Sequence, residues 1–134
     1  MKTTVNAFDY ASDICKVMNK GILLTTKVDN QVNTMTIGWG HIGIEWSRPV
    51  FVAYVRETRY TRQMLDKCGE FTINVPMGAV DPAILGFCGT KSGRDVNKIA
   101  NLGLTLEDPI SISVPGIKEL PLTLECKVIY KQEQ

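Results

Sequence analysis

The residues best suited to chemistry lie at the junction between a predicted strand and a predicted helix. Arg56, Thr58, Arg59 and Thr61 fall within six residues of one another there. The unpaired N–H groups and the dipole of a helix N-terminus favour an anion, and arginine adds a planar fork of donors that suits phosphate oxygens. We therefore predict a phosphate pocket at this junction. The alternative is a solvated basic turn in which Thr58 is an ordinary N-cap.

Two strands and a helix are expected to position this junction. Val50–Val55 is a continuous apolar run, which is typical of a strand buried on both faces. Tyr60, Met64 and Cys68 recur at every fourth residue and indicate a helix. Phe71–Val75 then predicts the second strand.

A second group of residues is suited to a flat ring with polar edges. In the predicted strand Gln31–Trp39, Met35 and Trp39 share one face and could pack on such a ring. Asn33, Thr36 and nearby backbone N–H groups could hydrogen-bond the edge of the ring. The alternative for Met35 and Trp39 is ordinary core packing.

A third candidate is the turn-rich loop Gly89–Gly93, which Arg94 follows directly. Lys91, Ser92 and Arg94 could complete an anion site, and the alternative is a solvated loop. The lone histidine, His41, lies outside any GxSxG or HExxH pattern, and no GxGxxG follows a predicted strand. We therefore predict no catalytic side chain, no hydrolytic centre and no Rossmann nucleotide site.

Length and composition indicate one domain, covering residues 1–134, that is large enough to bury a core. A net charge of +1 gives no support to a nucleic-acid or membrane surface as the main partner. No apolar run approaches the length of a membrane span, and acids occupy the N-terminal stretch where a signal peptide would be apolar, so we expect a cytoplasmic protein. The four cysteines form no CxxC pair and predict buried, reduced thiols with no metal site: Cys15, Cys68, Cys88 and Cys126.

The remaining pattern predicts a mainly β protein, a small barrel covered by short helices. A helix is expected over Asp9–Lys20, a hairpin joins Ile22–Val28 to Gln31–Trp39 through Asp29-Asn30, and Gly40–Pro49 is expected to be a loop. The other predicted elements are short helices and strands: helices at Pro82–Phe87, capped by Asp81, and at Val96–Asn101, capped by Asp95 and ended by Gly103, then strands at Leu104–Leu106, Ile110–Val114 and Leu122–Tyr130.

Four stretches together resemble the flavin reductase-like, FMN-binding split-barrel family, and its flavoredoxin-like branch in particular. They are NTMTIGWGHIG (Asn33–Gly43), RPVFVAYVRETRYT (Arg48–Thr61), FTINVP (Phe71–Pro76) and GTKSGRDVNK (Gly89–Lys98). The resemblance covers nearly the whole chain. It implies a Greek-key antiparallel split barrel, non-covalent FMN, and a homodimer with the flavin near the subunit interface.

The resemblance also implies three groups of cofactor-binding residues. They are a stretch lining the isoalloxazine (Asn33, Met35, Thr36 and Trp39), a phosphate-binding loop (Arg56, Arg59 and Thr61), and a loop that approaches the cofactor (Lys91, Ser92 and Arg94). Members of the branch usually continue with more strand after the position of Tyr130. Either the barrel closes with fewer strands, or a partner supplies an edge, or the chain is a truncated form; an unpaired last strand favours a dimer.

The function implied is an FMN-dependent oxidoreductase of the flavin or ferric reductase type. NAD(P)H would pass a hydride to the flavin, and the electrons would go on to an acceptor such as free flavin, ferric iron or a redox protein. One alternative is an electron-transfer flavoprotein without NAD(P)H turnover of its own. Another is a non-enzymatic small barrel that binds a different ligand or a protein.

Overall fold

A four-stranded antiparallel sheet is the main layer of the computed structural model, which describes residues 2–56, 58–78 and 80–132. The strand order is β2-β1-β5-β8. Its strands are β1 (Ile22–Val28), β2 (Gln31–Ile37), β5 (Glu70–Val75) and β8 (Leu122–Lys127). Two smaller pairs complete the strands: β3 (Gly40–Glu45) with β4 (Arg48–Ala53), and β6 (Leu106–Glu107) with β7 (Gly116–Ile117).

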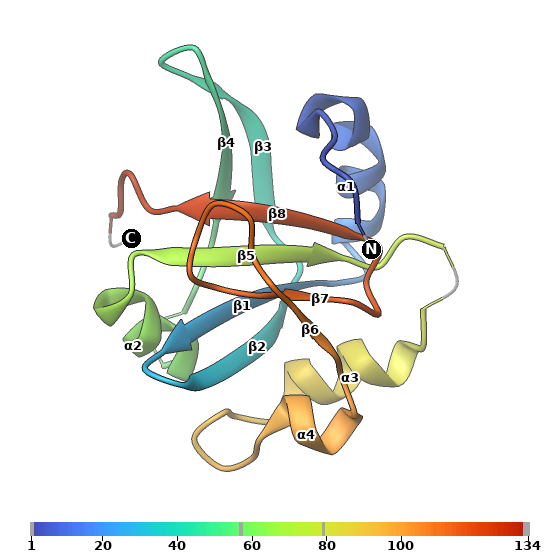
Figure 1. Ribbon diagram of the computed structural model, residues 1–134, viewed down its shortest axis with the longest axis vertical. Coiled ribbons are helices and arrows are strands. Elements are labelled where there is room, and N and C mark those ends of the chain that lie inside the picture. The colour runs from blue at the N-terminus through green and yellow to red at the C-terminus, as the bar shows by residue number, and fades with distance from the viewer. Residues whose placement is uncertain (1, 57, 79, 133–134) are drawn as a thin grey trace.

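The β3–β4 ribbon extends away from the four-stranded sheet but shares its core (Figure 1). Ile42 and Phe51, which lie opposite each other in the ribbon, pack against the cluster that contains Leu24, Met35 and Ile73. The sheet and the ribbon therefore enclose one apolar interior. This is the predicted split barrel, and every strand pair among the described residues is antiparallel.

Short helices cover this framework. They are η1 (Ala7–Tyr10), α1 (Ala11–Met18), α2 (Tyr60–Lys67), α3 (Pro82–Thr90) and α4 (Lys98–Leu102). Figure 1 shows α1 beside the ribbon, whereas α3 and α4 lie together at the opposite end of the molecule. α3 and α4 pack against β2, and α2 packs against β1. Each of the helices in the described ranges is too short to cross a membrane.

The two faces of the sheet carry different cores, because successive strand residues point to opposite sides. Leu24 and Met35 belong to the cluster with Ile14 and Met18 of α1. On the other face, Leu23 joins a cluster that is completed by α3, α4 and the chain around β7: Ile84, Cys88, Leu104, Ile117 and Leu120.

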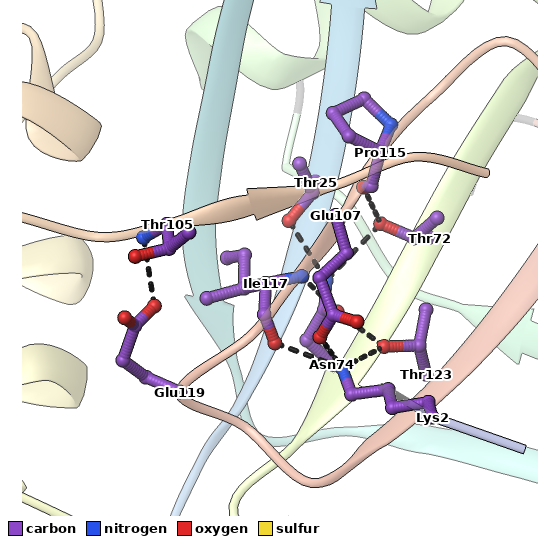
Figure 2. A network of polar contacts seen from close by, with 10 residues as sticks. All are labelled: Lys2, Thr25, Thr72, Asn74, Thr105, Glu107, Pro115, Ile117, Glu119 and Thr123. Carbon is purple, nitrogen blue, oxygen red and sulfur yellow. Dashed lines mark hydrogen bonds and ion pairs between the residues drawn. The ribbon is translucent and has the colours of Figure 1, made fainter.

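A buried amide, that of Asn74 in β5, organises the polar part of this second face (Figure 2). Its Nδ2 donates to the hydroxyls of Thr25 (3.0 Å) and Thr72 (3.1 Å). Its Oδ1 accepts from Ile117 N (3.0 Å) and from the Thr123 hydroxyl (2.9 Å). The Asn74 side chain therefore donates two hydrogen bonds and accepts two, and these bonds join β5 to β1, β7 and β8.

Lys2 fastens the N-terminal segment to the same network, as Figure 2 shows. Its Nζ donates to Ile117 O (2.9 Å) and to the Thr123 hydroxyl (2.7 Å). Glu107 Oε1 lies 3.2 Å from the same nitrogen, but this buried oxygen has no hydrogen bond. The ion pair with Lys2 is thus what compensates the Glu107 charge.

Several predicted elements are confirmed. Val28 lies opposite Gln31, so Asp29-Asn30 is the two-residue turn of the hairpin, with Asp29 at a left-handed φ of 54°. Asp81 caps α3 by accepting from Ala83 N (2.9 Å). The last strand is confirmed, although it ends at Lys127, before the predicted Tyr130.

The prediction of a strand buried on both faces at Val50–Val55 is wrong. The strand is β4 (Arg48–Ala53), and none of its residues is fully buried; Val52, for example, is 43% exposed. Gly40–Pro49 is mainly the partner strand β3 and not a loop. A Cβ on Gly40 would lie 2.9 Å from Val52 O, so the glycine permits the close strand approach.

Two further predictions in the second half of the chain are wrong. Ile110–Val114 forms no strand; its backbone is held by acids on the neighbouring strands, through Ile110 N to Glu125 and Ser113 N to Glu70. Asn97, and not Asp95, caps α4, because its Oδ1 accepts from Ala100 N (3.1 Å).

The cysteines in the described ranges are free thiols, as predicted. Only Cys88 is fully buried, however, and Cys15 is exposed on α1. Among these residues no group of three or more His, Cys, Asp or Glu side chains is placed to hold a metal.

Candidate functional site

The predicted strand-to-helix junction is a turn held by backbone groups. Arg59 N donates to Arg56 O (3.0 Å), and Arg62 N donates to Arg59 O (3.1 Å). Arg59 has an extended conformation at the N-cap position of α2 and makes no side-chain capping bond. Thr58 is therefore not the N-cap, which corrects the alternative reading of this stretch. Since no side chain caps α2, its first turn can offer N–H groups to a ligand.

Arg94 brings the loop after α3 to this junction. Its guanidinium donates to Thr58 O (3.5 Å) and lies 5.7 Å from the centre of the Tyr60 ring, within cation–π range. Gly93 permits the approach, because a Cβ there would collide with Asn33 Oδ1 and lie 2.9 Å from Tyr60. The structure thus brings the first and third predicted groups together.

Asn33 and Thr61 connect β2 to the first turn of α2. Asn33 Nδ2 donates to the Thr61 hydroxyl at 3.0 Å, and both side chains are buried. This hydrogen bond fixes α2 against β2. We expect Asn33 and Thr61 to influence a ligand by setting the position of α2 relative to β2.

The other members of these loops have different surroundings. The Ser92 hydroxyl accepts from Arg94 N (3.2 Å) and so shapes the loop that presents the guanidinium. Arg56 and Lys91 are exposed.

A groove of about 990 Å³ opens beside this meeting point. It runs from the tip of the β1–β2 hairpin past α2 to the loop before α4, and its lining includes Asn33, Tyr60, Gly93 and Arg94. Its charged lining is mixed and includes Lys67 and Arg94 as well as Asp29 and Asp95. The volume lies in the range of small-molecule sites.

Lys98 is the residue at this site that sequence reasoning missed. It is only 3% exposed, and its Nζ donates to Thr34 O (2.7 Å) and Cys88 O (2.9 Å). Burial lowers the pKa of its ammonium; ionisation of the Cys88 thiol would raise it, and the Arg59 guanidinium lowers it further. The motif GTKSGRDVNK contains Lys98, but a lysine in a short predicted helix carries no sign of burial.

Three of the residues expected to line the ring are not gathered at the groove. Met35 is 4% exposed in the core cluster of the opposite sheet face. The Thr36 hydroxyl donates to Leu85 O (2.6 Å), and Gly89 packs closely on its side chain. Trp39 is 70% exposed and lies beyond the end of β2.

Trp39 lines a second, smaller hollow of about 450 Å³ together with Cys15, Met18, His41 and Tyr54. Here His41 Nε2 lies 2.9 Å from the Tyr54 hydroxyl, with the rings edge-on at a centroid distance of 5.6 Å. His41 is thus a strand residue of β3, whereas the sequence places it in a loop. The two hollows lie on different elements. The first is lined by α2, α4 and the hairpin tip, and the second by α1, the start of β3 and Tyr54, which follows β4.

Comparison with known proteins supports the same family. Residues 17–134 match the family described as "Flavin reductase like domain". An uncharacterized protein of Archaeoglobus fulgidus is 34% identical over 101 residues, which are 75% of this chain and 56% of that protein. The chain therefore spans little more than half the length of this curated relative.

Solved structures give the same result. A flavoredoxin of Desulfovibrio vulgaris is similar with a TM-score of 0.77 and 29% identity, over 84% of this chain and 61% of that one. A flavoredoxin of Methanosarcina acetivorans has a TM-score of 0.73 and 27% identity, over 85% of this chain and 59% of that one. Nitrilotriacetate monooxygenase component B of Bacillus cereus, at 18% identity and a TM-score of 0.69, shares the fold over 97% of this chain and 69% of that one. The chain belongs to the flavin reductase-like family, in its flavoredoxin branch.

Proposed function

We propose that the protein binds FMN non-covalently and acts as an NAD(P)H-dependent oxidoreductase of the flavin or ferric reductase type. One observation carries the proposal: Arg94 contacts the turn at Arg59, where α2 begins without a side-chain cap. The chain in which these groups lie together belongs to the flavin reductase-like family.

The residues present fit the phosphate end of such a cofactor. Arg56, Arg59 and Arg94 supply guanidinium groups at one junction, and among the described residues none of the three has an aspartate or glutamate as an ion-pair partner. A dianionic phosphate would satisfy these donors with charge-assisted hydrogen bonds. The groove is also large enough for a mononucleotide.

Bound FMN would supply the hydride and electron chemistry, so the protein needs no acid or base side chain of its own. In this proposal Arg56 and Arg59 hold the phosphate, and Arg94 closes over it from the neighbouring loop. Asn33 and Thr61 fix the distance between the phosphate end and β2.

The simplest test is the absorbance spectrum of the purified protein, followed by anaerobic addition of NADH or NADPH. We expect a yellow protein whose absorbance near about 450 nm, the usual region for oxidised flavin, is bleached promptly. Flavin binding would be contradicted if the protein were colourless and if added FMN did not raise its melting temperature, because specific binding must stabilise the folded form.

A second candidate function is electron transfer without NAD(P)H turnover, which the two flavoredoxin structures favour. The same assay separates the two functions. Flavin that dithionite reduces but NADH and NADPH do not would support the electron-transfer protein and exclude the reductase.

We also propose that the protein is a homodimer. The β3–β4 ribbon exposes Ile44 (69%) and Trp46 (83%), and β8 lies at the end of the sheet order with Ile129 exposed after it. Exposed apolar side chains and a free strand edge favour association. Light scattering on the eluted protein should give twice the monomer mass, and Trp46→Ser should shift it towards the monomer.

A further inference from the structure

Lys98 connects three segments of the candidate site through one buried side chain. Its ammonium holds the carbonyl of Thr34, in β2, and that of Cys88, near the end of α3. The loop that presents Arg94 follows α3 directly, and Asn33, which precedes Thr34 in β2, donates to the Thr61 hydroxyl in the first turn of α2. The buried lysine therefore fixes β2, which contacts the start of α2, relative to the end of α3, from which the Arg94 loop continues.

The charge of Lys98 has no counter-charge in the described part of the chain. No aspartate or glutamate there forms an ion pair with it. β2 carries no charged side chain, and the titratable group that α3 offers is Cys88. Burial raises the pKa of that thiol to about 11, so it is neutral at pH 7. The other charged group whose field reaches Lys98 is the cation Arg59.

Such an arrangement is costly in the free protein. A buried charge requires a partner or shifts its pKa, and a neighbouring cation adds repulsion. An anion bound at Arg59 would remove both costs, because its field would act on the ammonium through a medium of low dielectric constant. Lys98 itself is too buried to touch that anion.

We propose that Lys98 is a positioning residue for the phosphate of the bound ligand: it ties β2 to the end of α3, and the phosphate balances its buried charge. The inference rests on the proposed function, in which that phosphate belongs to FMN. It predicts that binding of the phosphate and protonation of Lys98 are linked.

The wild-type protein gives the first test. A bound phosphate raises the pKa of Lys98, so binding takes up a proton and affinity falls as pH rises through the pKa of the free state. The dissociation constants of FMN and riboflavin should be measured by flavin fluorescence from about pH 7, where the phosphate is fully ionised, up to the ordinary lysine pKa of 10.5, below which burial moves the pKa of Lys98. We expect the preference for FMN to fall with pH, by at most about tenfold per unit for one linked proton. A preference that stays constant would overturn the proposal.

The second test uses Lys98→Met, with Lys20→Met as the matched control because Lys20 is exposed. We expect Lys98→Met to lose about tenfold or more of the preference for FMN over riboflavin, and to lose its pH dependence as well. Lys20→Met should keep both. Equal losses of FMN and riboflavin affinity in Lys98→Met would mean a purely structural role and would overturn the proposal.

Inorganic phosphate separates this inference from the proposed function. If no flavin binds, but phosphate raises the melting temperature of the wild type and not that of Lys98→Met, the anion role of Lys98 stands and the FMN function fails. If FMN binds with the same pH-independent preference in both proteins, the function stands and the role of Lys98 fails.

Discussion

Asn74 and Lys98 are two buried polar centres on the same face of the sheet, and they are satisfied in different ways. The Asn74 amide is neutral, and its four hydrogen bonds use its full capacity. Lys98 is a cation, and in the described part of the chain its ammonium group donates hydrogen bonds to two backbone carbonyls. A chain of hydrogen bonds connects the two centres. Asn74 donates to the Thr25 hydroxyl, and this hydroxyl donates to the Thr34 hydroxyl. The backbone carbonyl of Thr34 accepts from Lys98.

The contrast between the two centres suggests that Asn74 stabilises the fold, whereas Lys98 acts on ligand binding. A buried neutral network with every group paired rigidifies the core and leaves nothing for a ligand. A buried cation beside a second cation, with no carboxylate of the described residues paired to it, leaves a positive field that a bound anion would neutralise. We therefore expect changes at Asn74 to act on the free energy of unfolding, and changes around Lys98 and Arg59 to act on ligands that carry a phosphate.

The largest effect is expected for Asn74→Ala. The substitution removes four hydrogen bonds and leaves buried partners such as Ile117 N unpaired, so it should lower the free energy of unfolding by about 3 kcal/mol or more. Urea denaturation of the variant, with exposed Asn19→Ala as the control, measures this. A loss below about 1 kcal/mol would mean that the network is not the main polar support of the fold.

Arg56→Ala combined with Arg59→Ala should weaken ligand binding and leave the free energy of unfolding nearly unchanged. Each guanidinium is expected to contribute about 1.5 kcal/mol through charge-assisted hydrogen bonds, so FMN should bind about 100-fold more weakly while riboflavin changes little. Fluorescence titration measures both affinities. Arg48→Ala with Lys118→Ala removes the same charge from exposed positions and is the control. Equal losses for the two ligands would place the phosphate elsewhere.

Lys2→Met tests the edge of the Asn74 network. It removes two hydrogen bonds and leaves the Glu107 carboxylate without its ion pair, and we expect a loss of about 1 to 2 kcal/mol. Adding Glu107→Gln should restore part of this loss, because the uncompensated charge is then absent. Thermal unfolding of the two single variants and the double variant measures the coupling, and strictly additive losses would show that the ion pair contributes nothing.

The smallest effect is expected at Glu70, on the surface of the same sheet. The Ser113 hydroxyl (2.6 Å) and Ser113 N (3.0 Å) donate to its carboxylate and hold its pKa below the ordinary value, against the opposing effect of burial. A depressed folded-state pKa gives stability above the unfolded-state pKa, and this stability is lost as pH falls through the folded-state value. Glu70→Gln should therefore cost under about 1 kcal/mol at pH 7, and the difference should vanish at acid pH. Urea midpoints across that range measure this, and a difference that persists at acid pH would contradict the cause.

Local patterns predicted the elements whose rules are local. The turn at Asp29-Asn30, the cap at Asp81 and the alternation along β8 follow from backbone preferences and from a period of two. β4 was wrongly predicted to be buried because an apolar run does not show whether a strand joins the main sheet or a projecting ribbon. Ile110–Val114 was wrongly predicted as a strand because long-range bonds to Glu70 and Glu125 hold its backbone otherwise.

The sequence by itself determined the family, the split barrel and the residue types of the cationic junction. Arginine and threonine before a helix indicate an anion wherever they occur, so that inference needed no coordinates. The tertiary structure decided which of these residues meet. It placed Arg94 over Tyr60, kept Met35 in the core and Trp39 at a second hollow, and buried Lys98 with no carboxylate of the described residues paired to it. Burial and electric field depend on neighbours distant in the chain, and no local pattern records them.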